Sequence, residues 1–185
     1  MIRFALVVAS VLGFVLTAAL GNMMVPLLRE LQRVLETAIP RGFVDFYTGG
    51  AIGWDTYCAQ MVLDLREEYP GIALHLVLPC SREEQTARWS ERQRAAYDCI
   101  CREADSCEFI AESYTRGCMR LRNQRLVTLA DCCICYCREP EGRTGTAQTV
   151  RMARHKGIPV INLALDETAQ ARAATDALCG KDMEY

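Results

Sequence analysis

Short apolar runs alternate along the chain with longer segments in which apolar residues recur at helical spacing. The short runs predict strands at residues 43–48, 72–78, 105–110, 132–137 and 158–163. The longer segments predict helices at residues 25–39, 54–69, 81–103, 118–130, 146–156 and 166–178. Strands that are apolar throughout are typical of a sheet covered by helices on both faces. The alternation therefore predicts an α/β fold with a doubly wound, mostly parallel sheet flanked by helices.

The helix expected over residues 81–103 has its own start signal. Ser81 precedes it and Glu84 follows three residues later, which is the spacing of a capping box. Gln85 and Trp89 lie four residues apart, so a single helix would place them on one face. These two side chains are candidates for holding a planar base by stacking and amide hydrogen bonds. Packing of Trp89 against the sheet edge is an equal alternative.

The first 24 residues form an apolar segment unlike the rest of the chain. The run from Phe4 to Gly21 contains 18 residues and no charge, just short of the roughly 20 residues of a membrane span. One alternative is a membrane anchor that leaves the following domain in the cytoplasm, because arginines follow the run. The other is a buried strand at Ile2–Ala9 followed by an apolar helix. The chain accordingly divides into this segment, a domain over residues 25–165, and a C-terminal helix and tail over residues 166–185.

Charge and cysteine content narrow the class of protein. With 21 Lys and Arg against 23 Asp and Glu, the net charge is −2, so we expect no general nucleic-acid binding. The 11 cysteines are odd in number and irregularly spaced. Cys133, Cys135 and Cys137 share one face of an expected strand, which is a poor arrangement for zinc. We expect buried thiols in a reducing cytoplasm and no metal site, with a redox or metal role as the alternative.

Two glycine-containing turns each join an expected strand to an expected helix. The first contains Gly49, Gly50 and Gly53, and the second contains Gly142, Thr144, Gly145 and Thr146. Glycines let backbone N–H groups approach an anion, and the start of the next helix favours negative charge. In a parallel sheet both turns lie at the carboxyl edge, where ligands bind. The pair of turns therefore indicates a phosphate-bearing ligand.

Charged and polar residues near these turns are further candidates. Arg122 and Asn123 lie near the start of the helix at residues 118–130, where an arginine can pair with phosphate. Asp55 follows the first turn, and it can bond a ribose hydroxyl or cap its own helix. His75 lies inside an apolar strand, so we expect a core histidine. No Ser-His-Asp arrangement is apparent in the sequence.

Four motifs, taken in order and spacing, resemble the SLOG superfamily and most of all its YpsA-like branch. They lie at residues 48–55, 78–89, 114–123 and 142–149. The resemblance implies a Rossmann-like fold that binds a nucleotide or an NAD- or ADP-ribose-like ligand. Relatives in the superfamily include the DNA-uptake protein DprA and the phosphoribohydrolases called LOG.

Two departures from the family pattern shape the functional expectation. The apolar N-terminus replaces the usual Gly-His-Arg-Pro turn, and Thr149 replaces the acidic residue of the phosphoribohydrolases, whose chemistry needs a carboxylate. We therefore expect a domain that binds or senses AMP, NAD or ADP-ribose, with no catalytic residue and no required cofactor. One alternative is an N-glycosidic hydrolase of nucleoside monophosphates that uses Asp55 or Glu141. Another is a protein-interaction module with a degenerate pocket.

The resemblance also bears on the apolar N-terminus. A doubly wound sheet without its central strand leaves an open slot, so the resemblance favours a strand at Ile2–Ala9 over an anchor. We expect a cytoplasmic protein, with membrane anchoring as the close alternative. Binding to a protein partner and assembly into a homo-oligomer both stay open as alternatives.

Overall fold

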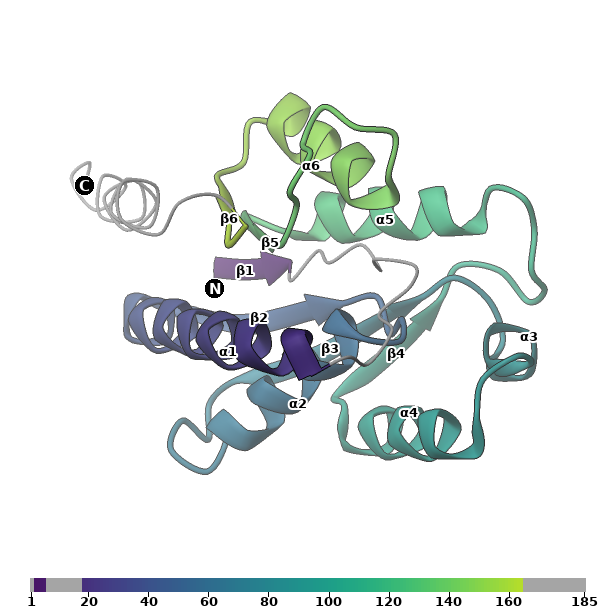
Figure 1. Ribbon diagram of the computed structural model, residues 1–185, viewed down its shortest axis with the longest axis horizontal. Coiled ribbons are helices and arrows are strands. Elements are labelled where there is room, and N and C mark those ends of the chain that lie inside the picture. Colours follow the sequence, from purple (N-terminus) through teal and green to yellow (C-terminus); the bar gives the residue numbers. More distant parts are fainter. Residues whose placement is uncertain (1, 6–17, 165–185) are drawn as a thin grey trace.

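The computed structural model describes residues 2–5 and 18–164, and these residues build a parallel sheet of six strands (Figure 1). The strand order is β4-β3-β2-β1-β5-β6, with every neighbouring pair parallel. The strands are β1 (Ile2–Ala5), β2 (Phe43–Thr48), β3 (Ala73–Leu78), β4 (Ser106–Phe109), β5 (Cys132–Cys135) and β6 (Val160–Asn162). The direction of winding reverses at β1. The carboxyl edge beside β1 is therefore the switch point at which α/β sheets bind ligands.

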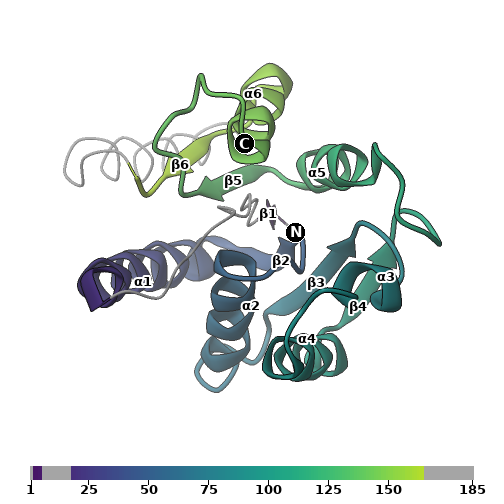
Figure 2. The same ribbon diagram turned by 45° about the vertical axis from the view of Figure 1, so that its right-hand side comes forward.

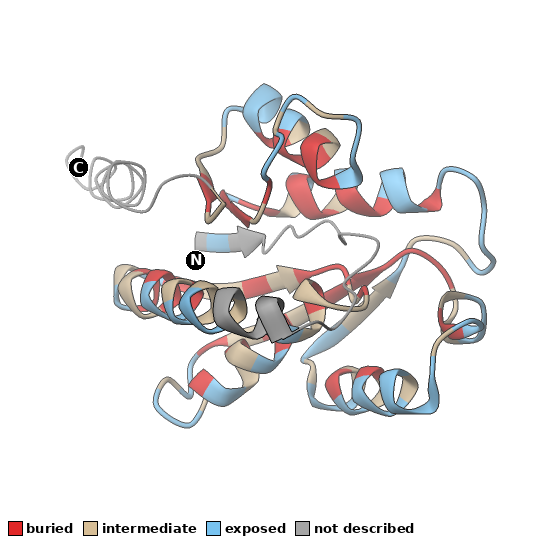
Figure 3. Cartoon of the chain, viewed as in Figure 1, coloured by how far each residue is buried: buried red, intermediate tan, exposed pale blue. Residues whose placement is uncertain are grey.

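Helices cover both faces of this sheet (Figure 2). One face carries α1 (Ala18–Ala38), α2 (Trp54–Leu65) and α4 (Glu91–Glu103), and the other carries α5 (Cys118–Leu129) and α6 (Gly145–Lys156). The short α3 (Arg82–Thr86) follows β3, and a 3-10 turn, η1 (Ile39–Arg41), ends α1. Each face has its own buried core, and the buried residues line the inner sides of the elements (Figure 3).

The structure confirms the α/β, Rossmann-like doubly wound fold. The strand expected at Ile2–Ala9 is present as β1 over Ile2–Ala5, between β2 and β5, and residues 6–9 lie outside the described residues. Helix α1 begins at Ala18 rather than at residue 25, and it contains Pro26. No helix in the described part of the chain combines the length and apolarity needed to cross a bilayer. The helix expected at residues 166–178 lies outside the described residues.

The prediction of one helix over residues 81–103 is wrong, because α3 ends at Thr86 and α4 begins at Glu91. The predicted capping box at Ser81 is also wrong, since the Ser81 side chain makes no capping hydrogen bond. The capping box is formed instead by Ser90 and Gln93. Ser90 Oγ accepts from Gln93 N–H over 3.3 Å, and Gln93 Oε1 accepts from Ser90 N–H over 2.8 Å. Two sequence signals of the same kind stand nine residues apart, and only the second begins a long helix.

The cysteines of β5 are buried, as the sequence predicted. Cys133, Cys135 and Cys137 pack in the core under α5 and α6, whereas Cys132 packs in the core on the opposite face. No disulfide bond joins any two of the ten described cysteines. Their small apolar side chains let helices approach β5 closely on both faces.

Candidate functional site

The turn between β2 and α2 lies at the carboxyl edge of the sheet, next to the central strand. Gly50 (φ 63°) and Gly53 (φ 95°) adopt backbone conformations that strain any other residue. Gly49 is required for a different reason, because a Cβ there would lie 1.4 Å from Nη1 of Arg122. The first glycine of the predicted motif thus lets a guanidinium lie directly against the backbone.

Arg122 forms a buried ion pair with Asp55 under this turn. Arg122 Nη1 donates to Asp55 Oδ2 over 3.2 Å, and the Ala51 N–H donates to the same oxygen over 3.0 Å. Asp55 and Arg122 are only 1% and 2% exposed. Helix capping by Asp55 is wrong, because no side chain caps α2. The structure therefore joins two predicted site residues that are 67 positions apart in the sequence.

Within the described part of the chain, four buried side-chain atoms on Arg122 and on residues that flank the Gly49–Gly53 turn have no hydrogen-bond partner. They are Thr48 Oγ1, Trp54 Nε1, Asp55 Oδ1 and Arg122 Nε. A buried polar group without a partner costs about 1–3 kcal/mol, and more when it is charged. Native proteins contain few such groups, so a cluster of them calls for a physical reason. Two of the four, Asp55 Oδ1 and Arg122 Nε, belong to the buried ion pair itself.

Burial raises the pKa of Asp55 to about 6, although Arg122 and the Ala51 N–H both act to lower it. The carboxyl group therefore changes its charge close to neutral pH, whereas the guanidinium stays positive. When Asp55 is protonated, the positive charge of Arg122 is not balanced by its partner. The site then favours an anionic ligand.

In the second predicted turn, between β5 and α6, some polar groups already form hydrogen bonds within the turn. Thr144 Oγ1 caps α6 by accepting from Ala147 N–H over 3.1 Å, and Gly142 N–H donates to Glu139 O over 2.9 Å. Gly145 begins α6, and Thr146 beside it is buried. The positive end of the α6 dipole lies at this turn. This turn thus contributes a helix start, with the Thr144 hydroxyl already engaged.

An aromatic pair that sequence analysis missed joins the two turns. Trp54 begins α2 and Tyr136 directly follows β5, and their ring centroids lie 6.2 Å apart at 42°. Arg138 Nε donates to the Tyr136 hydroxyl over 2.9 Å and holds that ring. The only signal in the sequence is an aromatic residue after each of the two segments: Trp54 follows the first glycine turn, and Tyr136 follows the strand β5. Aromatic faces at this position can stack on a planar ligand.

Gln85 and Trp89 do not share a helix face, contrary to the prediction. Gln85 lies in α3, and its Nε2 donates to Gly50 O over 2.8 Å. Trp89 lies between α3 and α4 and contacts Tyr97 edge-on, with centroids 5.6 Å apart. The packing alternative for Trp89 is the one observed. Of the two, only Gln85 lies at the glycine turn, where it supports the backbone.

The remaining candidates lie apart from one another. Asn123 is buried beside Arg122 in α5. Glu141, the second acid considered for hydrolysis, is exposed and pairs with Arg154 over 3.0 Å. Within the described residues, no group of three or more His, Cys, Asp or Glu side chains could hold a metal ion. The chemistry of the site therefore rests on Asp55, Arg122 and the two turns.

Fold and geometry together define a Rossmann-like α/β domain whose buried Asp55–Arg122 pair lies at the switch point of its sheet. Residues 23–166 match the family model YpsA, described as the YspA SLOG family. The chain belongs to this family, which confirms the resemblance found in the sequence.

Several UPF0398 proteins are similar to the chain. It is 32% identical over 81 residues to one from Bacillus pumilus, covering 44% of this chain and 42% of that protein. It is 32% identical over 68 residues to one from Staphylococcus haemolyticus, and this alignment covers 37% of this chain and 35% of that protein. A longer alignment, over 151 residues at 23% identity, covers 76% of this chain and 81% of a Bacillus velezensis protein. The alignments with the first two relatives thus span less than half of those proteins.

Two solved structures share the fold at 18% sequence identity. The X-ray structure of TM1055 has a TM-score of 0.52 and covers 86% of this chain and 72% of its own. DNA processing protein A from Helicobacter pylori is described as binding single-stranded DNA. Its structure matches with a TM-score of 0.53, and the match covers 95% of this chain and 72% of that protein chain. At this identity the likeness establishes the fold alone.

Proposed function

We propose that the chain binds a nucleotide-like ligand of the AMP, NAD or ADP-ribose class and acts as a binding or sensing domain with little turnover. The observation that carries the proposal is the buried pair of Asp55 and Arg122, in which Asp55 Oδ1 and Arg122 Nε have no hydrogen-bond partner among the described residues. A phosphate can accept hydrogen bonds from Arg122 and from N–H groups of the glycine turn. A ribose hydroxyl can donate to Asp55 Oδ1, and the base can stack at Trp54 and Tyr136.

Isothermal titration calorimetry with AMP, NAD and ADP-ribose tests this proposal. We expect saturable binding of at least one of them below millimolar concentration. Asp55→Asn and Arg122→Gln should each weaken binding about tenfold or more, since a hydrogen bond to a charged group is worth about 1.5–3 kcal/mol. Asp64→Asn and Arg120→Gln are matched controls, because these residues are exposed on the same two helices. Absence of binding to all three compounds at millimolar concentration would contradict the proposal.

A second candidate function, hydrolysis of an N-glycosidic bond, draws support from one observation. Asp55 is a buried carboxyl group with a pKa of about 6, which suits general acid–base catalysis near neutral pH. Thr149, at the position of the phosphoribohydrolase acid, donates its hydroxyl to Gly145 O over 2.9 Å and offers no carboxylate. Chromatography of AMP incubated with the protein separates the two functions. Adenine release that disappears in Asp55→Asn would favour the hydrolase, whereas binding without release favours the sensor.

The expectation of no general nucleic-acid binding stays a prediction. The likeness to a protein described as binding single-stranded DNA makes it worth measuring. Fluorescence anisotropy of a labelled thymine oligonucleotide should show no binding at physiological salt, because the net charge of −2 supplies no basic excess. Salt-sensitive binding would overturn the expectation without affecting the calorimetric test.

A further inference from the structure

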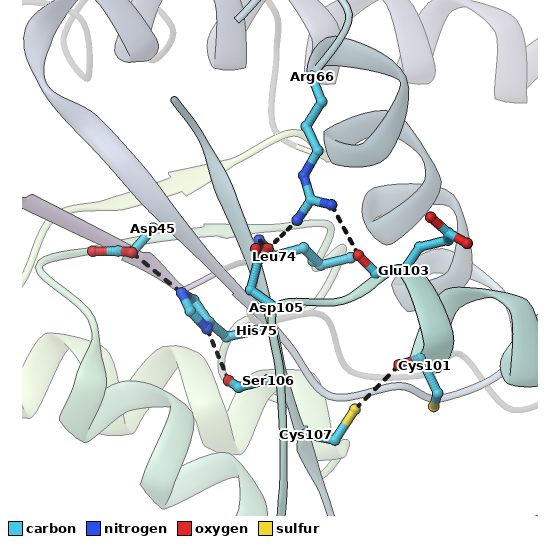
Figure 4. Close-up of polar contacts among 9 residues, drawn as sticks. All are labelled: Asp45, Arg66, Leu74, His75, Cys101, Glu103, Asp105, Ser106 and Cys107. Carbon is cyan, nitrogen blue, oxygen red and sulfur yellow. Dashed lines mark hydrogen bonds and ion pairs between the residues drawn. The ribbon is translucent and has the colours of Figure 1, made fainter. Parts of the chain in front are cut away.

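A second polar cluster lies on the sheet, away from the glycine turns. Asp45 on β2, His75 on β3 and Ser106 on β4 form a continuous hydrogen-bonded row (Figure 4). His75 Nδ1 lies 2.8 Å from Ser106 Oγ, and His75 Nε2 lies 3.2 Å from Asp45 Oδ1. The three strands are adjacent, so the parallel register itself places the side chains together. The structure thus corrects two expectations, of a core histidine and of no Ser-His-Asp arrangement.

The hydrogen bonds fix the role of each atom in the neutral imidazole. An ionised Asp45 carboxylate can only accept, so His75 Nε2 carries the hydrogen. Nδ1 then has a free lone pair and accepts from the Ser106 hydroxyl. The Tyr47 ring stacks on the imidazole with centroids 4.7 Å apart at 25°, which restricts rotation of the ring. This is the arrangement in which a histidine acts as general base toward a serine.

The serine of this row is accessible. Ser106 is exposed, whereas the side chains of His75 and Asp45 keep only 18% and 16% of their surface. Among the described strands β4 is an outer strand. The Asp105 N–H donates inward to Leu74 O, so the next N–H along, that of Ser106, points to the open edge. That N–H is a donor for an oxyanion formed at Ser106.

Several charged groups lie near Tyr47, which stacks on the imidazole of the row. Arg3 from β1, Glu108 from β4 and Arg125 from α5 face Tyr47 together with Asp45. Arg125 Nε donates to both carboxylate oxygens of Glu108, over 2.8 and 3.1 Å. Arg3 supplies a further positive charge on the Asp45 side of the row. A nucleophile in this setting suits a small ester better than a large apolar one.

We propose that Ser106 is a nucleophile toward small carboxylic esters, with His75 as its general base and Asp45 as a positioning residue. Ser106 Oγ bonds to the acyl carbon while its proton moves to His75 Nδ1. That proton then passes to the departing alkoxide, and the alcohol leaves. Water then gives a proton to His75 Nδ1 as its oxygen bonds to the acyl carbon, the bond from that carbon to Ser106 Oγ breaks, and the proton returns from His75 to Ser106 Oγ as the carboxylic acid leaves. The activity is independent of the nucleotide site, because no residue is shared with it.

A fluorophosphonate probe tests the nucleophile on the full chain, since phosphorus bonds to an activated serine oxygen with loss of fluoride. Mass spectrometry of the digested protein should place one adduct on the peptide containing Ser106. Ser106→Ala should abolish the adduct, and Ser113→Ala, at another exposed serine, should leave it unchanged. His75→Gln should slow labelling about a hundredfold, the lower range of general-base catalysis. Thermal melts of each variant establish that it is folded.

The labelling rate of Asp45→Asn separates positioning by Asp45 from a purely structural role. Asp45→Asn should slow labelling without changing the thermal melt, because the Asn amide can donate to His75 Nε2 and so favour the tautomer whose Nδ1 cannot accept from Ser106. p-Nitrophenyl acetate hydrolysis should follow the same order of variants. Absence of a Ser106 adduct, or labelling at an equal rate in His75→Gln, would overturn the proposal.

Discussion

At the scale of single residues, the candidate site depends on how closely the Arg122 guanidinium approaches the backbone of Gly49. The guanidinium is buried, and its ion-pair partner Asp55 lies at the start of α2. A buried ion pair adds little net stability over an apolar pair, but removing one partner costs about 3–5 kcal/mol. The proposed ligand would give partners to Asp55 Oδ1 and Arg122 Nε, which have none among the described residues.

Gly49→Ala should displace Arg122, because the new methyl group would stand where Nη1 now lies. We expect a loss of about 3 kcal/mol in the free energy of unfolding, measured by urea denaturation. Gly71→Ala is the control, since a Cβ there meets nothing within 4 Å. Equal stability of the two variants would show that the guanidinium moves aside freely.

The raised pKa of Asp55 predicts a pH-dependent stability. The ordinary value is 3.8 and the folded value is about 6, so the folded chain binds this proton more tightly than the unfolded chain. The contribution of Asp55 to stability is therefore fully present below about pH 4 and is lost as the pH rises through 6. Relative to Asp55→Asn, the wild type should gain about 1 kcal/mol between pH 7.5 and pH 5 in urea titrations. A difference that does not change with pH would contradict this assignment.

At the scale of elements, α3 and α4 are separate helices, and the first of them contacts the glycine turn. Gln85 Nε2 donates to Gly50 O, and α3 ends at Thr86, one residue further on. Arg82 and Asp98 join the two helices, with the two guanidinium–carboxylate distances at 2.5 Å. The capping box at Ser90 fixes where the second helix begins.

Ser90→Ala should lower the free energy of unfolding by about 1 kcal/mol, because it removes the side-chain acceptor of the capping box. Ser81→Ala should change stability far less, since the Ser81 side chain makes no capping bond. Chemical denaturation of both variants measures the difference. Equal losses would mean that the start of α4 does not depend on its cap.

At the scale of the whole molecule, β1 joins the two halves of the sheet. It pairs with β2 on one side and with β5 on the other. Asp131 also binds β1, because its Oδ2 accepts from Arg3 N–H over 2.8 Å and its own N–H donates to Arg3 O over 2.7 Å. The switch point exists only while this strand is in place.

Asp131→Ala should therefore destabilise the chain by about 1–2 kcal/mol, since the lost hydrogen bond has a charged acceptor. Arg3→Ala is the matched control, because Arg3 contributes backbone atoms to this contact and its side chain is exposed. We expect its effect to stay within about 0.5 kcal/mol. In thermal melts, Asp131→Ala should lower the melting temperature more than Arg3→Ala does.

The strands and helices of the fold can be predicted from the local pattern of apolar residues in the sequence. The contacts between site residues cannot be predicted in this way. Apolar runs such as residues 43–48 predicted strands that the structure contains, because a period of two or a buried run is a property of neighbouring residues. By contrast, no glycine or proline in residues 87–90 marks the end of α3 after Thr86.

The site residues were predicted one at a time, and their partners were not. Asp55 and Arg122 were candidates, but a pairing across 67 positions depends on tertiary packing. The Trp54–Tyr136 contact and the Asp45–His75–Ser106 row arise in the same way, from strands that become neighbours only in the folded sheet.

The central claim is that a nucleotide-like ligand occupies the turn above the Asp55–Arg122 pair, and a crystal structure of the protein grown with ADP-ribose tests it most directly. We predict a phosphate within hydrogen-bond distance of Arg122 or of the backbone N–H groups of Gly49–Gly53. We also predict that Asp55 Oδ1 gains a hydrogen-bond partner. Density for ADP-ribose at another surface, with the four buried polar atoms at this turn still unpartnered, would contradict the account.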